Sequence, residues 1–331
     1  MKEYGGYFEA EELSETINVF PANAFITKSA RASIGRILMV KKPTQVYLPY
    51  FCCNALLEPF ELCKIPYHFY SINPRFELHD LPELQSGEMI VYVNYFGLKN
   101  NYSRMLCDRY RNQLILDNTQ ALFFELTKDE QVYTVNSFRK FFGVPDGSLL
   151  HVPDSDFELF NKIKFSANTR FTTEHLLLRK AGKTQEGYAH FGKNELMAGE
   201  GFDDISDYSR ERISHIDYRN AAKARLQNFS YLHAQLKSLN TLQLPVDNHP
   251  VPFSYPYWPK HPIRHEQLWQ KKIFAPILWR ECLTRNEAGF ETEKSLSLNV
   301  LHLPVDHRYS EKDMRHLVDT IARMADAESK Q

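Results

Sequence analysis

The chain has 331 residues, which is enough for a large hydrophobic core and for two lobes. Its 40 basic residues nearly balance its 41 acidic residues, so bulk charge gives no reason to expect binding to nucleic acid or to an anionic membrane. No apolar run approaches the roughly 20 residues that span a bilayer, and the N-terminus lacks the apolar core of a signal peptide.

Cysteine and glycine usage narrow the class further. The five cysteines form no CxxC pair and no metal-ligand spacing, and such an odd set without a signal peptide is typical of reduced thiols in the cytoplasm. Glycine is sparse, with 13 in the whole chain. The sequence contains neither GxGxxG nor GxxxxGK[ST], which argues against a nicotinamide site or a P-loop nucleotide site.

Helix and strand patterns alternate in the first third of the chain. Residues 27–40 carry apolar side chains at helical spacing, and Thr27 or Ser29 can cap that helix. Further helices are expected at 53–63 and 100–112, and strands at 46–50, 68–72 and 89–96. This alternation predicts βαβ units and a mainly parallel sheet, and therefore an α/β fold.

Polar side chains follow two neighbouring apolar runs near the middle of the chain. Residues 114–116 end at Asp117, and residues 132–135 end at Ser137, with Lys140 shortly after. Buried strands with polar residues at their carboxyl ends are how an open α/β sheet presents chemistry. We therefore expect a carboxylate, a hydroxyl and an amine to meet at one edge of the sheet.

Those three groups suit pyridoxal phosphate. This cofactor needs a lysine amine for its aldehyde, a carboxylate against its ring nitrogen and donors for its phosphate. Lys140 is the only lysine between Lys128 and Lys162, so it has little competition for that role. The alternative is that Asp117 caps a turn and Lys140 is a solvated surface charge.

The pattern Asp-x-x-Gln-Ala at 117–121, followed by Ser-Phe-x-Lys at 137–140 and a glycine-bearing turn, resembles the DegT/DnrJ/EryC1/StrS family of sugar aminotransferases. These are pyridoxal phosphate enzymes of fold type I. The resemblance implies a large cofactor-binding domain over residues 1–215, with a mainly parallel seven-stranded sheet between helices. It implies a smaller α+β domain over residues 216–331 and a bridging helix over about 206–239.

The resemblance also assigns roles to four residues of the central stretch. Asp117 would pair with the pyridinium nitrogen and Gln120 would lie beside the phenolic oxygen of the ring. Ser137 would hold the phosphate, and Lys140 would carry the cofactor. The spacing from Ser137 to Lys140 is shorter than in many family members.

A second part of the phosphate site would lie at the start of the first helix. The family has a Ser-Gly-Thr or Ser-Gly-Arg turn there, and this chain has Ser29, Ala30 and Arg31. Free N–H groups and the helix dipole at such a terminus favour an anion. Alanine in place of glycine leaves those donors present.

Two further positions follow from the resemblance. An aromatic ring that stacks on the cofactor would fall on Cys53, with Phe51 as a substitute, and strand alternation does not choose between them. Asn94 and Tyr95 follow the strand that borders the substrate pocket in the family. We therefore treat Asn94 and Tyr95 as candidate substrate contacts.

The second half of the chain gives weaker signals. Residues 148–152 read as a return strand after a GVPDG turn, and residues 156–180 are helical in pattern. Residues 181–204 hold many glycines and no periodicity, which predicts a mobile segment. The family has Gly-x-Asn-x-Arg in this region, reaching a neighbouring subunit, but this chain lacks the asparagine and no residue is carried over.

Transamination of a keto-sugar, attached to a nucleotide, is the activity that the resemblance implies. The amino donor would be an amino acid such as glutamate, and the pathway would be surface polysaccharide or antibiotic-sugar synthesis. Family members are homodimers with shared active sites, so a homodimer is expected.

Two alternatives stay open. The family's sugar dehydratases have histidine in place of the lysine, so Lys140 disfavours a dehydratase. A non-catalytic homologue that binds the cofactor or a partner is compatible with Ala30, Cys53, the short spacing to Lys140 and the missing asparagine.

Overall fold

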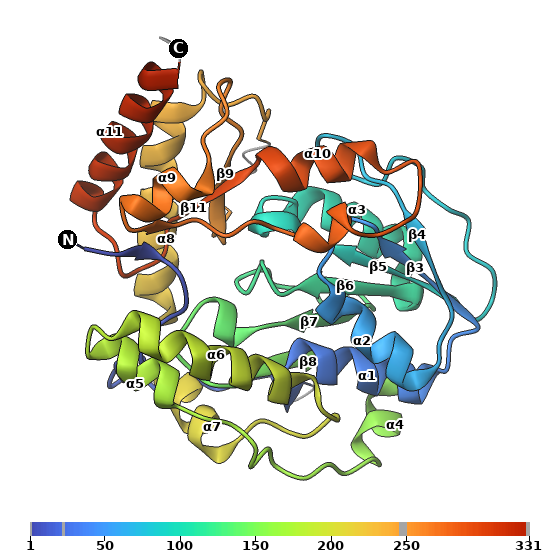
Figure 1. Cartoon of the computed structure of the whole chain (residues 1–331). Helices are drawn as coiled ribbons and strands as arrows, with labels where there is room; N and C mark the ends of the chain where they lie inside the picture. The colour runs from blue at the N-terminus through green and yellow to red at the C-terminus, as the bar shows by residue number, and fades with distance from the viewer. Residues whose placement is uncertain (1, 22–23, 245–249, 329–331) are drawn as a thin grey trace.

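A seven-stranded sheet lies at the centre of the computed structural model, which describes residues 2–21, 24–244 and 250–328. Its strand order is β2-β8-β7-β6-β5-β3-β4, as Figure 1 shows. Strands β3 to β7 run parallel, and β8 is antiparallel to both of its neighbours. The strands are β2 (Ala24–Thr27), β3 (Gln45–Pro49), β4 (Tyr67–Tyr70), β5 (Glu88–Val93), β6 (Leu114–Asn118), β7 (Tyr133–Asn136) and β8 (Ser148–His151). The predicted α/β fold with a mainly parallel seven-stranded sheet is confirmed.

Helices cover both faces of this sheet. The helices in this part of the chain are α1 (Ala30–Lys41), α2 (Asn54–Cys63), α3 (Asn100–Tyr110), α4 (Phe157–Asn161), α5 (Glu174–Lys180), α6 (Thr184–Gly199) and α7 (Asp207–Ser214). In β6, Ile115 joins the core formed with α1 and α2, whereas Leu114 and Leu116 join the core that includes α3. Successive residues of a strand face opposite sides, so a strand buried on both faces is apolar throughout.

The C-terminal part packs beside the sheet and continues from α8 (Figure 1). Its elements are α8 (Tyr218–Leu236), β9 (Ser254–Tyr257), α9 (His265–Gln270), β10 (Ile273–Phe274), α10 (Glu291–Asn299), β11 (Leu301–Pro304) and α11 (Glu311–Glu328). Strand β9 pairs antiparallel with β11, as expected for a proline-bearing edge strand. Single turns of 3-10 helix lie at Tyr95–Gly97, Arg111–Gln113, Phe138–Lys140, Asp154–Asp156 and Arg280–Leu283.

The N-terminus joins the C-terminal part through a two-residue strand. β1 (Tyr4–Gly5) pairs parallel with β10, and the Tyr4 amide donates to the Lys272 carbonyl at 2.9 Å. A Cβ atom on Gly5 would lie 2.5 Å from the Phe274 carbonyl oxygen, and Gly5 has a φ of +78°. Only glycine fits that approach without strain.

Two expectations for the middle of the chain are wrong. Within residues 156–180 the structure has α4 and α5, separated by extended chain, because Ala167 bridges to Asp204 and Asn168 donates to Asp146. Residues 181–204 contain the 16-residue helix α6 rather than an irregular segment. Its Gly187 lies against Tyr7, where a side chain would clash, so this glycine serves close packing rather than chain mobility.

The bridging segment at 206–239 is also divided. Helices α7 and α8 replace the single predicted helix, and the break falls at residues 215–217. Asp217 caps α8, since its carboxylate accepts from the Asn220 amide at 2.9 Å. An N-cap residue has non-helical backbone, so the preceding helix ends before it.

Leu116→Ala tests the central strand. Leu116 is fully buried in β6, and we expect the free energy of unfolding to fall by about 2–5 kcal/mol from lost burial and the cavity left behind. Leu298→Ala on α10, where the leucine is 62% exposed, is the matched control and should change it little. Chemical denaturation measures both, and equal effects would contradict the assigned burial.

Candidate active site

Asp117 and Lys140 come from neighbouring parallel strands. Asp117 is the fourth residue of β6 and pairs in register with Val135 of β7, while Lys140 ends the 3-10 turn that follows β7. The Lys140 amine donates to the Thr119 hydroxyl at 3.0 Å, and the Thr119 amide donates to Asp117 Oδ1 at 2.8 Å. Thr119 therefore connects the two residues that the sequence predicted to work together.

One carboxylate oxygen of Asp117 is available to a ligand. Only 6% of Asp117 is exposed, and its Oδ2 has no hydrogen-bond partner among the described residues. A carboxylate oxygen that has no donor, on a residue that is otherwise largely buried, is a suitable acceptor for a ligand N–H.

Gln120 and Ser137 lie at the same edge of the sheet. Gln120 is 1% exposed, and its Oε1 accepts from the Phe96 amide at 3.0 Å, which fixes the orientation of the side chain. Ser137 starts the turn that ends at Lys140, and no hydrogen bond to its hydroxyl is present among the described residues. The Ser137 hydroxyl is thus available to a ligand.

The structure separates the two candidates for stacking. Phe51 is fully buried in the core, with its ring 4.8 Å from that of Trp279. Cys53 is half-buried, and burial raises the pKa of its thiol while the charge of Lys140 lowers it and that of Asp117 raises it. The charges of Lys140 and Asp117 therefore act on Cys53, whereas Phe51 packs in the core. Strand alternation does not apply to Phe51 and Cys53, because both lie between the end of β3 at Pro49 and the start of α2 at Asn54.

Helix α6 covers the start of α1. Ser29 is the N-cap of α1, accepting from the Ala32 amide at 3.2 Å and donating to the Ala198 carbonyl at 2.8 Å. Ala30 is the first residue of the helix. The Arg31 guanidinium pairs with Glu58 at 2.8 Å and donates to the Glu195 carbonyl at 2.7 Å. The start of α1 therefore forms a capped helical turn at the predicted residues, with α6 packed against it, and phosphate binding there stays a prediction.

Asn94 and Tyr95 lie in the interior. The Asn94 amide donates to Asn100 at 2.9 Å and to Asn118 at 3.2 Å, so it ties β5 to β6 and to the start of α3. Tyr95 is fully buried and donates to the Phe51 carbonyl at 3.0 Å. Neither is among the described residues that line the cleft described next.

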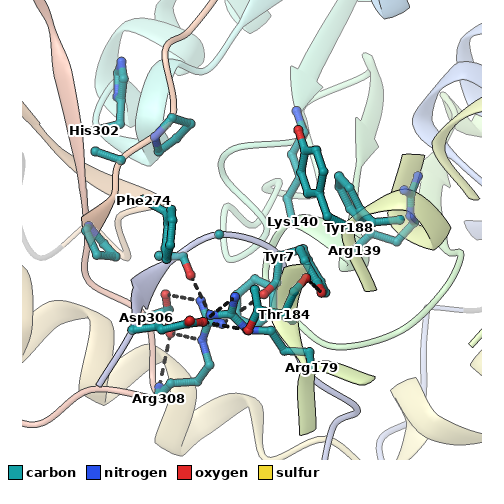
Figure 2. A pocket seen from close by; sticks show the side chains of 18 of the residues that line it. Tyr7, Arg139, Lys140, Arg179, Thr184, Tyr188, Phe274, His302, Asp306 and Arg308 are labelled. Carbon is teal, nitrogen blue, oxygen red and sulfur yellow. Dashed lines mark hydrogen bonds and ion pairs between the residues drawn. The ribbon is translucent and has the colours of Figure 1, made fainter. Parts of the chain in front are cut away.

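A cleft of about 1220 Å³ opens onto this edge of the sheet. Figure 2 shows Arg139 and Lys140 on one side of it and His302, Asp306 and Arg308 on the other. Asp117, Gln120 and Cys53 are not among its described lining residues, so the cleft reaches the site at Ser137 and Lys140. Seven basic residues line it, against the three acidic residues Glu3, Glu195 and Asp306: Arg139, Lys140, Arg179, Arg225, Lys272, Arg280 and Arg308. This excess favours an anionic ligand.

Two arginines of the cleft lie in deeply buried positions. Arg308 forms a two-pronged pair with Asp306, at 2.7 and 3.0 Å. Arg225 is 1% exposed, and among the described residues it donates only to the carbonyls of Pro252, Phe253 and Phe141. Burial lowers its pKa to about 10. A buried cation without a paired carboxylate adds to the positive potential of the cleft.

Sequence reasoning missed several lining residues. Arg139 stands inside the Ser-Phe-Arg-Lys motif, so its place directly before Lys140 was a signal that could have been used. Glu195 and Arg179 had no local signal, because they reach the cleft only through the packing of α5 and α6. Tyr7 comes from the N-terminal segment, which β1 holds in place.

Comparison with known proteins adds to this description. No protein-family model and no curated protein matches the chain. Solved structures match it along most of its length. PseC of Helicobacter pylori, an aminotransferase involved in the biosynthesis of pseudoaminic acid, superposes with a TM-score of 0.64 over 98% of this chain and 100% of its own, at 12% identity. The chain has the fold of the sugar aminotransferases.

Two further structures agree with this sugar aminotransferase fold. The sugar aminotransferase CalS13 from Micromonospora echinospora has a TM-score of 0.61 and 15% identity, over 90% of this chain and 86% of its own. A DegT DnrJ EryC1 StrS aminotransferase from Brucella abortus has a TM-score of 0.59 and 15% identity, over 90% and 85%. The fold-type I architecture expected from the sequence resemblance is confirmed.

Asp306→Asn tests the buried ion pair of the cleft. Burial opposes ionisation of Asp306, but Arg308 outweighs it and lowers the pKa of the carboxyl to about 2. A carboxyl whose pKa is lower in the folded state than in the unfolded state stabilises the fold at pH values above its unfolded-state pKa. This stability is lost as the pH falls through the folded-state pKa. The difference in unfolding free energy between wild type and variant should therefore shrink by about 2 kcal/mol between pH 5 and pH 2.

The control for this experiment is Asp108→Asn, at an exposed position of α3. Denaturant unfolding across the pH range measures both differences. If the Asp306→Asn difference stays constant from pH 5 downward, Arg308 does not hold this carboxyl ionised.

Proposed function

We propose that the protein is a pyridoxal phosphate-dependent aminotransferase that converts a keto-sugar to an amino sugar, with an amino acid such as glutamate as donor. The supporting observation is the constellation at the ends of β6 and β7: the Lys140 amine, the Asp117 carboxylate with its free Oδ2, and the Thr119 hydroxyl between them. The fold supports the same reading, since Spr1654 from Streptococcus pneumoniae, which shares it, was solved in a PMP form.

The residues present fit the cofactor. Asp117 Oδ2 lacks a donor among the described residues and would accept from the ring N–H, while Ser137 and the first turn of α1 would hold the phosphate. Lys140 would hold the aldehyde end, and Cys53 would lie against the ring. When bound, pyridoxal phosphate would supply an aldehyde for the amino group and a ring that withdraws electrons.

Lys140 has a second task in this proposal. Its Nζ, once free, would take the proton from the α-carbon of the bound amino acid as a general base. Thr119 Oγ1, 3.0 Å from Nζ, would accept a hydrogen bond from the amine and fix its position. Asp117 would keep the ring nitrogen protonated, which stabilises negative charge at the reacting carbon.

The basic cleft supports an anionic sugar substrate. Seven lysine and arginine side chains line it, and DesI, another protein of this fold, was solved in the presence of its TDP-sugar product. We therefore include a nucleotide-linked keto-sugar in the proposal. A homodimer, a cytoplasmic location and a role in polysaccharide synthesis belong to the same proposal. No described helix combines the length and apolar character needed to cross a bilayer.

A non-catalytic binding role is the second candidate. One observation favours it, because α6 packs on the turn that would take the phosphate. An absorbance spectrum with added pyridoxal phosphate, recorded before and after glutamate, separates the two candidates.

Lys140→Ala tests the central assignment. Wild type mixed with pyridoxal phosphate should develop the absorbance band of a lysine-linked cofactor, and glutamate should remove that band. The variant should show neither change, because the amine is gone. Lys162→Ala, at an exposed position, is the matched control and should behave as wild type. A band that survives in Lys140→Ala would refute the assignment of this lysine.

Asp117→Asn tests the ring partner separately. The band should still form, because Lys140 is intact, but its loss on adding glutamate should slow by roughly a hundredfold or more as charge stabilisation is removed. Stopped-flow absorbance measures this rate. An unchanged rate would mean that Asp117 does not contact the cofactor ring.

A further inference from the structure

Two arginines converge on one carboxylate where α6 meets the start of α1. Arg139 lies in the turn between Ser137 and Lys140, and its Nη2 pairs with Glu195 Oε1. Arg31, from the first turn of α1, approaches Glu195 Oε2 at 3.6 Å. Glu195 is thus the anion shared by two cations that come from different parts of the chain.

The two guanidinium groups form a site that requires an anion. Their side chains are only 13% and 12% exposed for Arg31 and Arg139. Both guanidinium groups lie on the same Glu195 carboxylate, and burial and the charge of Arg31 lower the pKa of Arg139 to about 10. Charges of like sign this close in a partly buried position are stable only with a negative group between them.

The surroundings select the class of anion. Arg139 and Ser137 line the cleft, and the first helical turn beside Arg31 carries N–H groups without intrahelical partners. Two guanidinium groups and a helix N-terminus offer several N–H donors, and phosphate, with three acceptor oxygens, can accept more of these hydrogen bonds than a single carboxylate.

We propose that Arg31 and Arg139 form the seat of a phosphate monoester, and that the Glu195 carboxylate occupies this seat whenever no phosphate is bound. Phosphate binding then requires Glu195 to leave. The proposal rests on the proposed function in one respect, since the phosphate is that of pyridoxal phosphate.

Glu195 can leave without undocking α6. Its side chain is 42% exposed, so the carboxylate can rotate into solvent. The backbone contacts of the helix do not depend on this carboxylate, because Arg31 donates to the Glu195 carbonyl and Ser29 donates to the Ala198 carbonyl. Arg31 also keeps Glu58 as a partner at 2.8 Å. The exchange of the Glu195 carboxylate for phosphate is therefore local, and Glu195 acts as an intramolecular competitor of the phosphate.

Isothermal titration calorimetry on the full chain tests this with three probes: inorganic phosphate, pyridoxal phosphate and pyridoxal, which lacks the phosphate. In Glu195→Gln the Kd for both phosphate compounds should fall by roughly tenfold, the effect of removing one competing charge-assisted hydrogen bond. The Kd for pyridoxal should not change. Arg139→Gln should raise the Kd for the phosphate compounds, and Arg139→Lys should restore part of the loss.

Glu186→Gln is the matched control, since Glu186 lies on the same helix and its one ion pair within the described part of the chain is with exposed Lys183. Circular dichroism checks that each variant is folded. The proposal is overturned if Glu195→Gln binds phosphate and pyridoxal phosphate no more tightly than wild type, or does not bind them, or if pyridoxal affinity shifts equally.

The two hypotheses fail separately. Loss of the glutamate-sensitive band with an intact phosphate effect would reject transamination and keep the phosphate seat. A normal band with unchanged phosphate affinity in Glu195→Gln would reject the seat and keep transamination.

Discussion

The parallel pairing of β6 with β7 is the constraint on which the site depends. Strand β6 is buried on both faces, so its polar side chains are tolerated only where the strand ends, whereas β7 buries Tyr133 and Val135 on one face. The register of Asp117 with Val135 then brings a carboxylate to the same edge as the turn that carries Lys140. Thr119 fixes the remaining geometry through two hydrogen bonds. The candidate chemistry follows from strand register before any loop is considered.

Ion pairs between distant segments give the cleft its shape. Arg179 of α5 approaches Glu3 at 3.4 Å, and Arg139 pairs with Glu195 of α6. Each pair joins segments more than fifty residues apart, and both arginine side chains are largely buried. Removing one partner of such a partly buried ion pair strongly destabilises the fold, because the other charge is left buried without a partner. The N-terminal segment and α6 are therefore parts of the cleft wall rather than attachments to it.

The sequence predicted the elements and site residues whose signals are local, but not those whose conformation depends on tertiary packing. Apolar runs ending at Asp117 and Ser137 predicted the sheet edge. Helical spacing predicted α1 with Thr27 or Ser29 as its cap, and the structure has Ser29. The helix α6 was missed because its glycines, such as Gly187, allow close contact with Tyr7, 180 residues away. Residues between α4 and α5 follow an extended path because they pair with Asp204, a non-local partner. No periodicity in a single sequence encodes such contacts.

Under the proposed function, Cys53 rather than an aromatic residue would lie against the cofactor ring, and this changes what must hold the cofactor. A thiol covers much less of a ring than an aromatic side chain, so less binding free energy comes from stacking. The phosphate and the Asp117 hydrogen bond then carry a larger share. A carboxylate such as Glu195, competing for the phosphate seat, gains influence for the same reason. The two departures from the expected site, one at the ring and one at the phosphate, thus act on the same quantity, the affinity of the unloaded chain for its cofactor.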